Sequence, residues 1–157
     1  MSLLHVSINA RAPERVALVV AELMGGRAMP FPPFPDSWIA FAARDDGSAI
    51  EVYPTTHVLQ PGPNQIACIE QAPADTPTFV HAAIASPMPA DEILRCAEAQ
   101  DWLARRCDRG PFECIEVWLE NRLLVEVLDP AMQADYHRGM TMANWARMFG
   151  MDDEPDT

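Results

Sequence analysis

The 157-residue chain contains no lysine: all eleven of its basic residues are arginine, against 23 aspartates and glutamates. The absence of lysine excludes a Schiff-base lysine and the lysine of a phosphate-binding P-loop. The resulting net charge of −12 disfavours nucleic acids, anionic membranes and highly charged anionic substrates as partners. We therefore expect neither a nucleic-acid-binding nor a membrane-surface protein.

The chain also lacks the features of an exported or disulfide-bonded protein. Its four cysteines form no C-x-x-C pair, which argues against a zinc knuckle or a disulfide framework. The N-terminus has neither the basic nor the apolar region of a secretion signal, and no apolar run reaches the roughly 20 residues that span a membrane. We therefore expect a cytoplasmic protein with reduced thiols.

Two segments, whose histidines lie 76 residues apart, show the same alternation of apolar and polar side chains. Residues 3–9 read LLHVSIN, and residues 78–84 read TFVHAAI. Period two over this length is typical of half-buried β-strands. In a second matched pair of strand-like segments, residues 49–53 and 124–128, a glutamate lies between aliphatic residues. The two halves of the chain are therefore copies of one sequence repeat.

The spacing of the polar residues supports this repeat. Glu51 follows His5 by 46 residues, and Glu126 follows His81 by 45. A difference of one residue over so long a span corresponds to a single loop deletion. The four residues therefore occupy two matched pairs of positions.

The material between these strands corresponds as well. Helices entered through a proline are predicted at residues 11–24 and 87–100, and the Gly25-Gly26 pair should end the first of them. Further strands are predicted at residues 38–43 and 114–119. Each half then runs strand, helix, strand, strand, strand. We predict an α+β fold built from tandem βαβββ modules.

The repeat divides the chain into four parts. Residues 1–54 form the first module, residues 55–77 a proline-rich connector, and residues 78–130 the second module. Residues 131–157 are predicted to form a C-terminal helix and an acidic tail. Within the connector, residues 65–69 have the composition of an edge strand.

The predicted C-terminal helix has recognisable ends. Thr141 is a suitable N-cap, and Gly150 is a suitable C-terminal glycine. The stripe along one side of this helix can pack on the protein's own surface, close over a substrate site or join a dimer interface. Its residues are Met142, Trp145 and Phe149.

Alternation along the strands assigns the polar residues to one face of the sheets. If the aliphatic residues pack under the helices, then His5, Glu51, His81 and Glu126 all point to the opposite face. Two imidazoles and two carboxylates on one surface are suited to Zn, Ni, Co, Mn or Fe(II). The same rule assigns four further residues to this face, where they would line a substrate site or fill it: Trp38, Tyr53, Glu116 and Trp118.

A paired βαβββ arrangement with His, Glu, His and Glu at these positions resembles the vicinal oxygen chelate superfamily. This superfamily includes glyoxalase I, methylmalonyl-CoA epimerase, extradiol dioxygenases and fosfomycin-resistance proteins. The resemblance covers roughly residues 2–130. It implies a cup-shaped, curved mixed sheet with the helices outside. It also implies that His5, Glu51, His81 and Glu126 bind a divalent metal.

The resemblance further implies a function. A glyoxalase-like protein would act on a small oxygen-bearing substrate by isomerase or lyase chemistry through a metal-stabilised enediolate. Glu126 is then the first candidate for the catalytic base and Glu51 the second. We also expect a homodimer, because members of the superfamily often pair modules across a two-fold axis.

Two alternatives remain open at this stage. One is a metal-free protein that sequesters a small molecule in the same cup. The other is an Fe(II) extradiol-type dioxygenase. The sequence also leaves open whether one chain or two chains complete the set of four ligands.

Overall fold

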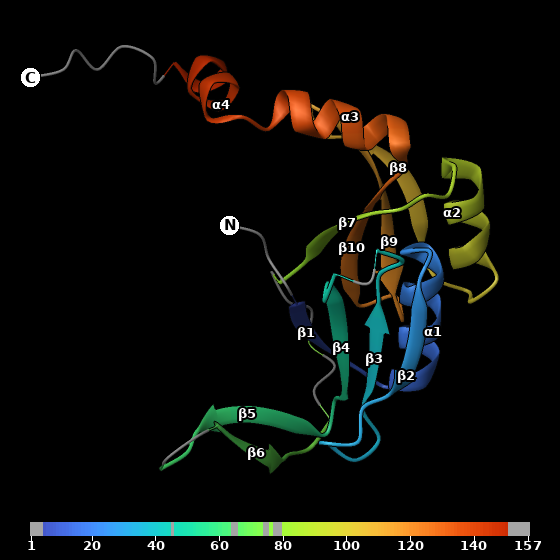
Figure 1. Cartoon of the computed structure of the whole chain (residues 1–157), viewed down its shortest axis with the longest axis vertical. Coiled ribbons are helices and arrows are strands. Elements are labelled where there is room, and N and C mark those ends of the chain that lie inside the picture. Colours follow the sequence, from blue (N-terminus) through green and yellow to red (C-terminus); the bar gives the residue numbers. More distant parts are fainter. Residues whose placement is uncertain (1–4, 45, 64–65, 74–75, 77–79, 151–157) are drawn as a thin grey trace, which may run out of the picture.

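The computed structural model describes residues 5–44, 46–63, 66–73, 76 and 80–150. Within these residues the chain forms two four-stranded mixed sheets, a two-stranded hairpin and four helices (Figure 1). The sheet orders are β1-β4-β3-β2 and β7-β10-β9-β8. In both sheets the first strand of the module pairs in parallel with the last. The predicted α+β fold of two βαβββ modules is therefore confirmed.

The first module begins and ends its helix as its residue types dictate. Pro13 occupies the first turn of the helix, where its missing N–H costs nothing. After the helix Gly25 adopts a φ of +66°, and the N–H of Gly26 donates to the carbonyl of Ala21. This is the Schellman ending of a helix. The elements are β1 (His5–Ala10), α1 (Pro13–Leu23), β2 (Arg27–Pro30), β3 (Trp38–Phe41) and β4 (Ala49–Pro54).

The second module repeats this order with a shorter helix. The hairpin between its last two strands turns through Glu120 and Asn121, which both have positive φ; such turns match the right-handed twist of the strands that they connect. Part of the strand predicted at residues 78–84 lies outside the described residues. The elements are β7 (Ala82–Ala85), α2 (Ala90–Glu98), β8 (Ala104–Asp108), β9 (Glu113–Leu119) and β10 (Leu123–Leu128).

One hydrophobic core lies under both helices. Figure 1 shows α1 and α2 next to each other on one side of the molecule. The core is a single cluster that takes aliphatic side chains from both modules. The polar faces of both sheets therefore lie on the sides turned away from a common interior. Among its fully buried members are Val16, Val20, Leu23, Val52, Ile93, Val117, Val125 and Val127.

Polar contacts from the β9–β10 hairpin fix the second module against the first. The carboxylate of Glu120 accepts hydrogen bonds from the backbone N–H groups of Arg11 and Ala12, each at 2.8 Å. The buried Arg122 donates from Nη2 to Oδ1 of Asn9 at 2.9 Å. The hairpin of the second module thus contacts the chain between β1 and α1.

The connector and the C-terminus differ from the sequence predictions. The predicted edge strand is β6 (Ile66–Glu70), which pairs with β5 (His57–Pro61) in a hairpin of its own rather than with either large sheet. The C-terminal part contains two helices, α3 (Pro130–Gly139) and α4 (Met142–Phe149), where the sequence predicted one.

The ends of α4 agree with the prediction. Helix α3 was not predicted, and its burial pattern explains why. Thr141 accepts from the N–H of Asn144, and Gly150 has a φ of 65°. Helix α3 buries only Met132 and Gly139, so its apolar periodicity is weak.

The acidic tail lies outside the described residues. No helix in the described part of the chain is long and apolar enough to span a membrane.

Candidate functional site

The glutamates of the two histidine–glutamate pairs occupy equivalent register positions. In the first sheet Ser7 of β1 lies opposite Glu51 of β4, and in the second Ala83 of β7 lies opposite Glu126 of β10. His5 of β1 precedes Ser7 by two positions, so it lies on the same face as Glu51. His81 stands directly before the first residue of β7 rather than within that strand, and what relates it to Glu126 is the cavity that both line. Each module therefore carries a histidine in, or directly before, its first strand and a glutamate on the strand paired with it.

In the first module, hydroxyl groups hold the carboxylate of Glu51. Ser7 Oγ donates to Oε2 at 2.9 Å, and Tyr53 Oη donates to the same oxygen at 2.8 Å. Burial raises the pKa of Tyr53, and its hydrogen bond to the carboxylate raises it further. Tyr53 therefore keeps its proton and remains a donor at neutral pH. His5 is exposed and lines a cavity of about 510 Å³ beside β7.

In the second module, an arginine holds the carboxylate of Glu126. Arg109, in the loop after β8, donates from Nε to Oε1 of Glu126 at 2.8 Å. His81 and Glu126 line the same cavity, of about 550 Å³. The other wall of that cavity is apolar and aromatic, and comes from the β8–β9 loop and from α3 and α4. Its members include Phe112, Tyr136, Met140, Trp145 and Phe149.

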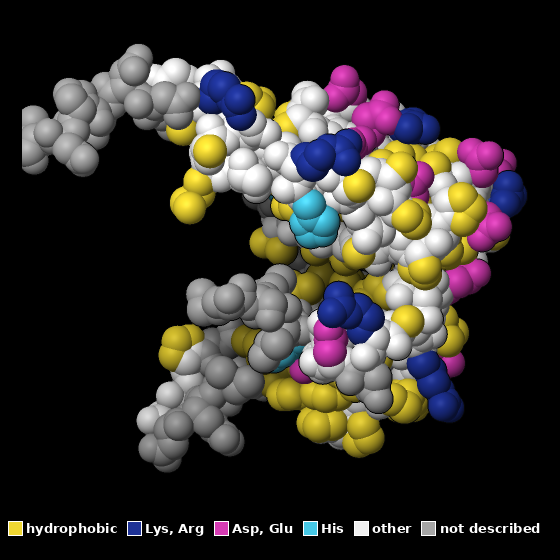
Figure 2. All heavy atoms as spheres, turned by 45° about the horizontal axis from the view of Figure 1, so that its top comes forward, with side chains coloured by type: hydrophobic (Ala, Val, Ile, Leu, Met, Phe, Trp, Pro, Cys, Tyr) yellow, Lys and Arg dark blue, Asp and Glu magenta, His cyan; other side chains and the backbone are white. Residues whose placement is uncertain are grey.

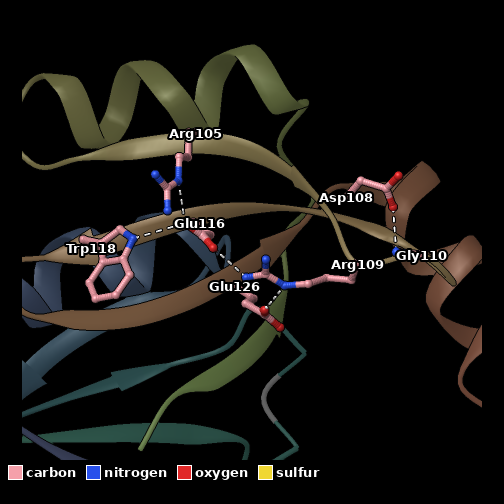
Figure 3. Close-up of polar contacts among 7 residues, drawn as sticks. All are labelled: Arg105, Asp108, Arg109, Gly110, Glu116, Trp118 and Glu126. Atoms are coloured by element: carbon pink, nitrogen blue, oxygen red, sulfur yellow. Dashed lines mark hydrogen bonds and ion pairs between the residues drawn. The ribbon is translucent and has the colours of Figure 1, made fainter. Parts of the chain in front are cut away.

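Glu116 is the most heavily bonded carboxylate of the second sheet (Figure 3). It is 5 % exposed and accepts from Arg109 Nη2 at 2.6 Å, from Arg105 Nε at 2.7 Å and from Trp118 Nε1 at 3.3 Å. Burial by itself would raise the pKa of Glu116, but the hydrogen bonds from Arg109 and Arg105 outweigh burial and lower it to about 2. Glu116 is therefore a permanent anion and a structural partner of both arginines.

The four predicted ligands do not meet in one place within the chain. His5 lines one cavity, whereas His81 and Glu126 line another. Among the described residues no group of three or more His, Cys, Asp or Glu side chains is arranged to hold a metal ion. On the face shown in Figure 2 the molecule is hollowed between its two parts, with hydrophobic side chains at the bottom of the hollow. One chain therefore presents two separate histidine–glutamate half-sites.

No protein-family model and no curated protein matches the sequence. Solved structures do match. FosX from Listeria monocytogenes, in complex with Mn(II) and sulfate, has a TM-score of 0.56 and 12 % identity over 87 % of this chain and 96 % of that one. The trypanothione-dependent glyoxalase I of Leishmania major has a TM-score of 0.53 and 12 % identity over 96 % and 99 %. Lactoylglutathione lyase from Agrobacterium tumefaciens has a TM-score of 0.52 and 10 % identity over 82 % and 93 %.

The chain has the fold of these glyoxalase and FosX structures. The matches span nearly the whole length of each of these proteins, so both βαβββ modules are included. Sequence identities this low establish a shared fold only. The chemistry depends on the residues of this chain.

One residue assigned to the polar face lies on the other side of its sheet. Trp38 pairs with Val52, a fully buried core residue, whereas Ile39 pairs with Glu51. The prediction that Trp38 shares the face of Glu51 is therefore wrong. Its cause is a slip of one residue in the match between the β3 and β9 segments, because such a slip exchanges the two faces of a strand. Tyr53 and Trp118 do lie beside their glutamates.

Sequence reasoning missed the two arginines. Arg105 lies opposite Glu116 in the β8–β9 register, so pairing the predicted strands could have found it. Arg109 follows β8 in a loop where Asp108 accepts from the N–H of Gly110 at 2.6 Å and Gly110 has a φ of +88°. The Asp-x-Gly spacing predicts such a turn, but not the direction in which its arginine extends.

We expect Glu116→Gln to lower the free energy of unfolding by about 1–3 kcal/mol at neutral pH, because it leaves buried donors without a charged acceptor. Since the pKa of Glu116 is about 2, below its ordinary 4.5, this stabilisation is present above about pH 4.5 and is lost as the pH falls towards 2. Urea unfolding at several pH values measures the difference.

The matched control is Glu113→Gln. Glu113 belongs to the same strand, but its pair with Arg106 is exposed on both sides, and such pairs contribute less than about 1 kcal/mol. Equal losses in the two variants would contradict the structural role assigned to Glu116.

Proposed function

We propose that the protein is a glyoxalase-like, metal-dependent enzyme that acts on a small oxygen-bearing substrate by isomerase or lyase chemistry. The observation that carries this proposal is the equivalent register of Glu51 and Glu126, each accompanied by a histidine at the matching position of the chain. A histidine two positions before the residue that faces a glutamate occurs once in each module. A packed sheet does not require this arrangement, whereas a ligand set repeated by duplication does.

The donor set fits a divalent first-row metal in its chemistry. Imidazole nitrogens and carboxylate oxygens together suit Zn, Ni, Co, Mn and Fe(II). Glu51 lies on an accessible sheet face, and His5 and His81 are exposed. The ligands would be His5, Glu51, His81 and Glu126.

The separation of the half-sites favours assembly from two chains. In a two-fold symmetric dimer, the first module of one chain faces the second module of the other, and the same contact occurs twice. His5 and Glu51 of one protomer would then join the partner's His81 and the partner's Glu126. Two such sites would form in each homodimer.

The chain's own residues would perform the proton transfer. A bound divalent metal polarises a substrate carbonyl and lowers the energy of developing negative charge on oxygen. Glu126 would take the proton from the hydroxyl-bearing carbon beside that carbonyl and return it to the carbonyl carbon, while the proton of the substrate hydroxyl would pass to the former carbonyl oxygen. Glu51 is the second candidate for this base; the hydroxyl groups of Ser7 and Tyr53 fix its orientation.

The remaining surroundings of the site suggest the kind of substrate. The apolar wall from α3 and α4 would contact an uncharged part of the substrate and reduce the access of water. A net charge of −12 disfavours a polyanionic substrate. The four cysteines are unpaired, which suits a reducing compartment, and we propose a cytoplasmic location.

A metal-free binding protein is the second candidate, and one observation favours it. Arg109 already supplies a positive charge to Glu126, and the cavity that they line has an aromatic wall. Such a cavity can bind a small molecule without a metal.

Metal content distinguishes the two candidates. Protein purified without chelators or nickel resin is expected to contain, or to take up, about one Zn, Ni, Co, Mn or Fe(II) per chain, the number given by two shared sites in a dimer. His81→Ala should lose this metal, because it removes an imidazole ligand. The matched control His137→Ala should retain it, since His137 is an exposed residue of α3.

Elemental analysis and calorimetric titration provide the measurement. Metal-loaded protein should then isomerise adducts of 2-oxoaldehydes and thiols, the simplest substrates for this chemistry. A wild-type protein that binds none of these metals and gains no thermal stability from them would overturn the proposal in favour of the metal-free candidate.

A further inference from the structure

The guanidinium group of Arg109 lies between two carboxylates of the second sheet (Figure 3). Nη2 donates to Oε1 of Glu116 at 2.6 Å, and Nε donates to Oε1 of Glu126 at 2.8 Å. The backbone of the same residue is held as well, since its N–H donates to the carbonyl of Phe112 at 2.8 Å. Arg109 is therefore positioned by its loop and bridges the two anions.

The two carboxylates depend on Arg109 to different degrees. Glu116 also receives hydrogen bonds from Arg105 and Trp118 and is buried in the sheet. Glu126 is also buried, but the hydrogen bond that holds its carboxylate comes from Arg109, and it lines a cavity together with His81. If the contact between Arg109 and Glu126 broke, the pair with Glu116 would still balance the charge of the guanidinium.

This arrangement places a cation on the carboxylate that a metal ion would need. We infer that Arg109 is the internal counter-cation of the second half-site: it neutralises Glu126 in the metal-free protein, competes with a divalent metal for that carboxylate, and stays attached to Glu116 when the metal displaces it. The inference rests on the proposed metal site and adds a residue that sets its affinity.

The charges explain why such a residue is useful. Arg105, Arg109, Glu116 and Glu126 together are electrically neutral. Without Arg109 the sheet face would carry one uncompensated carboxylate in a chain that is already strongly acidic, and it would attract any dication. Arg109 therefore weakens adventitious binding and leaves metal affinity to the complete set of ligands.

The test is calorimetric titration of metal-free protein with Co(II) and Ni(II). Arg109→Gln should bind the metal about tenfold more tightly than the wild type, because binding no longer breaks a charge-assisted hydrogen bond. Arg109→Lys, which keeps the charge, should stay close to the wild type. The matched control Arg106→Gln should not change the affinity, since Arg106 pairs with Glu113 instead.

A further variant tests the role of Glu116 as the anchor and does not depend on the folding of Arg109→Gln. In Glu116→Gln the guanidinium has no second carboxylate to retain it, so displacing it from Glu126 costs more. This variant should bind metal more weakly than the wild type. Circular dichroism confirms that each variant is folded before titration.

The outcomes separate the inference from the proposed function. Metal binding by Arg109→Gln that equals or falls below that of the wild type would overturn the inference while leaving the metal site in place. Tighter binding by Arg109→Gln than by a wild type that also binds the metal would support it. Absence of binding in every variant would overturn the proposed function and the inference with it.

Discussion

A mixture of His5→Ala and His81→Ala chains is expected to bind divalent metal although neither variant binds it alone. In the proposed dimer, each site takes one half from each protomer. A heterodimer of the two variants therefore has one site with both defects and one site with neither. Each homodimer has a defect in both of its sites.

The amount recovered follows from counting. Random pairing of the two variants makes about half of the dimers heterodimers, and each of these has one intact site of two, so about a quarter of the wild-type capacity should return. Co-expression of the two chains with different tags gives the mixture, and elemental analysis of the doubly tagged fraction measures it. In that fraction about half of the wild-type metal should be present.

The control uses two defects in the same module. A mixture of His5→Ala chains and Glu51→Ala chains has both defects in the first module. Each heterodimer of these two variants therefore contains no intact site. Their mixture should bind no metal. If this mixture also recovered metal, or if the first one recovered none while the wild type bound it, the two-chain site would be wrong and a site within one chain would have to be considered.

The repeat shows how far sequence reasoning reaches in this protein. Alternation and spacing predicted the two βαβββ modules, and the observed sheet orders confirm them. The register places His5 on the face of Glu51, whereas His81 lies just before β7, where strand alternation no longer assigns a face. The predictions of the modules and of His5 succeeded because period two and duplicated spacing are properties of the chain itself. The face predicted for Trp38 was wrong because the segment around β3 contains no polar residue that fixes its register. A slip of one position then exchanges the two faces of the strand.

Other parts of the site could not be predicted from the chain. The distance between the half-sites depends on how α1 and α2 pack against each other. The hydrophobic pattern within one module does not predict how that module packs on the other. The position of Arg109 depends on the path of a loop and on the carboxylates that it meets. Helix α3 has a proline and an aspartate cap at its start, but too few apolar residues to show a helical period.

The largest expected loss of stability comes from a single methyl group at Gly26. This residue follows α1, where its backbone passes directly beside β3. A Cβ atom on Gly26 would lie 1.9 Å from the carbonyl oxygen of Phe41 and 2.8 Å from the carbonyl carbon of Ala42. Both are backbone atoms, so no side-chain rotation can relieve the overlap.

We expect Gly26→Ala to cost about 3 kcal/mol or more, at the upper end for overpacking. For a domain of this size that corresponds to a fall of about 6–12 °C in Tm. The loss of stability arises in the first module. There β3 must move away from the end of α1, which disturbs its pairing with β4, the strand that carries Glu51. Thermal unfolding followed by circular dichroism measures the change.

Gly47→Ala is the control that separates steric overlap from backbone strain. Gly47 has a φ of +86° and no heavy atom within 4 Å of a Cβ built on it, so its substitution should cost only about 1 kcal/mol. If Gly26→Ala lost no more stability than Gly47→Ala, the close approach of the α1 ending to β3 would not be required for folding. The Gly25-Gly26 pair would then matter only as the end of a helix, which is all that the sequence alone predicts for it.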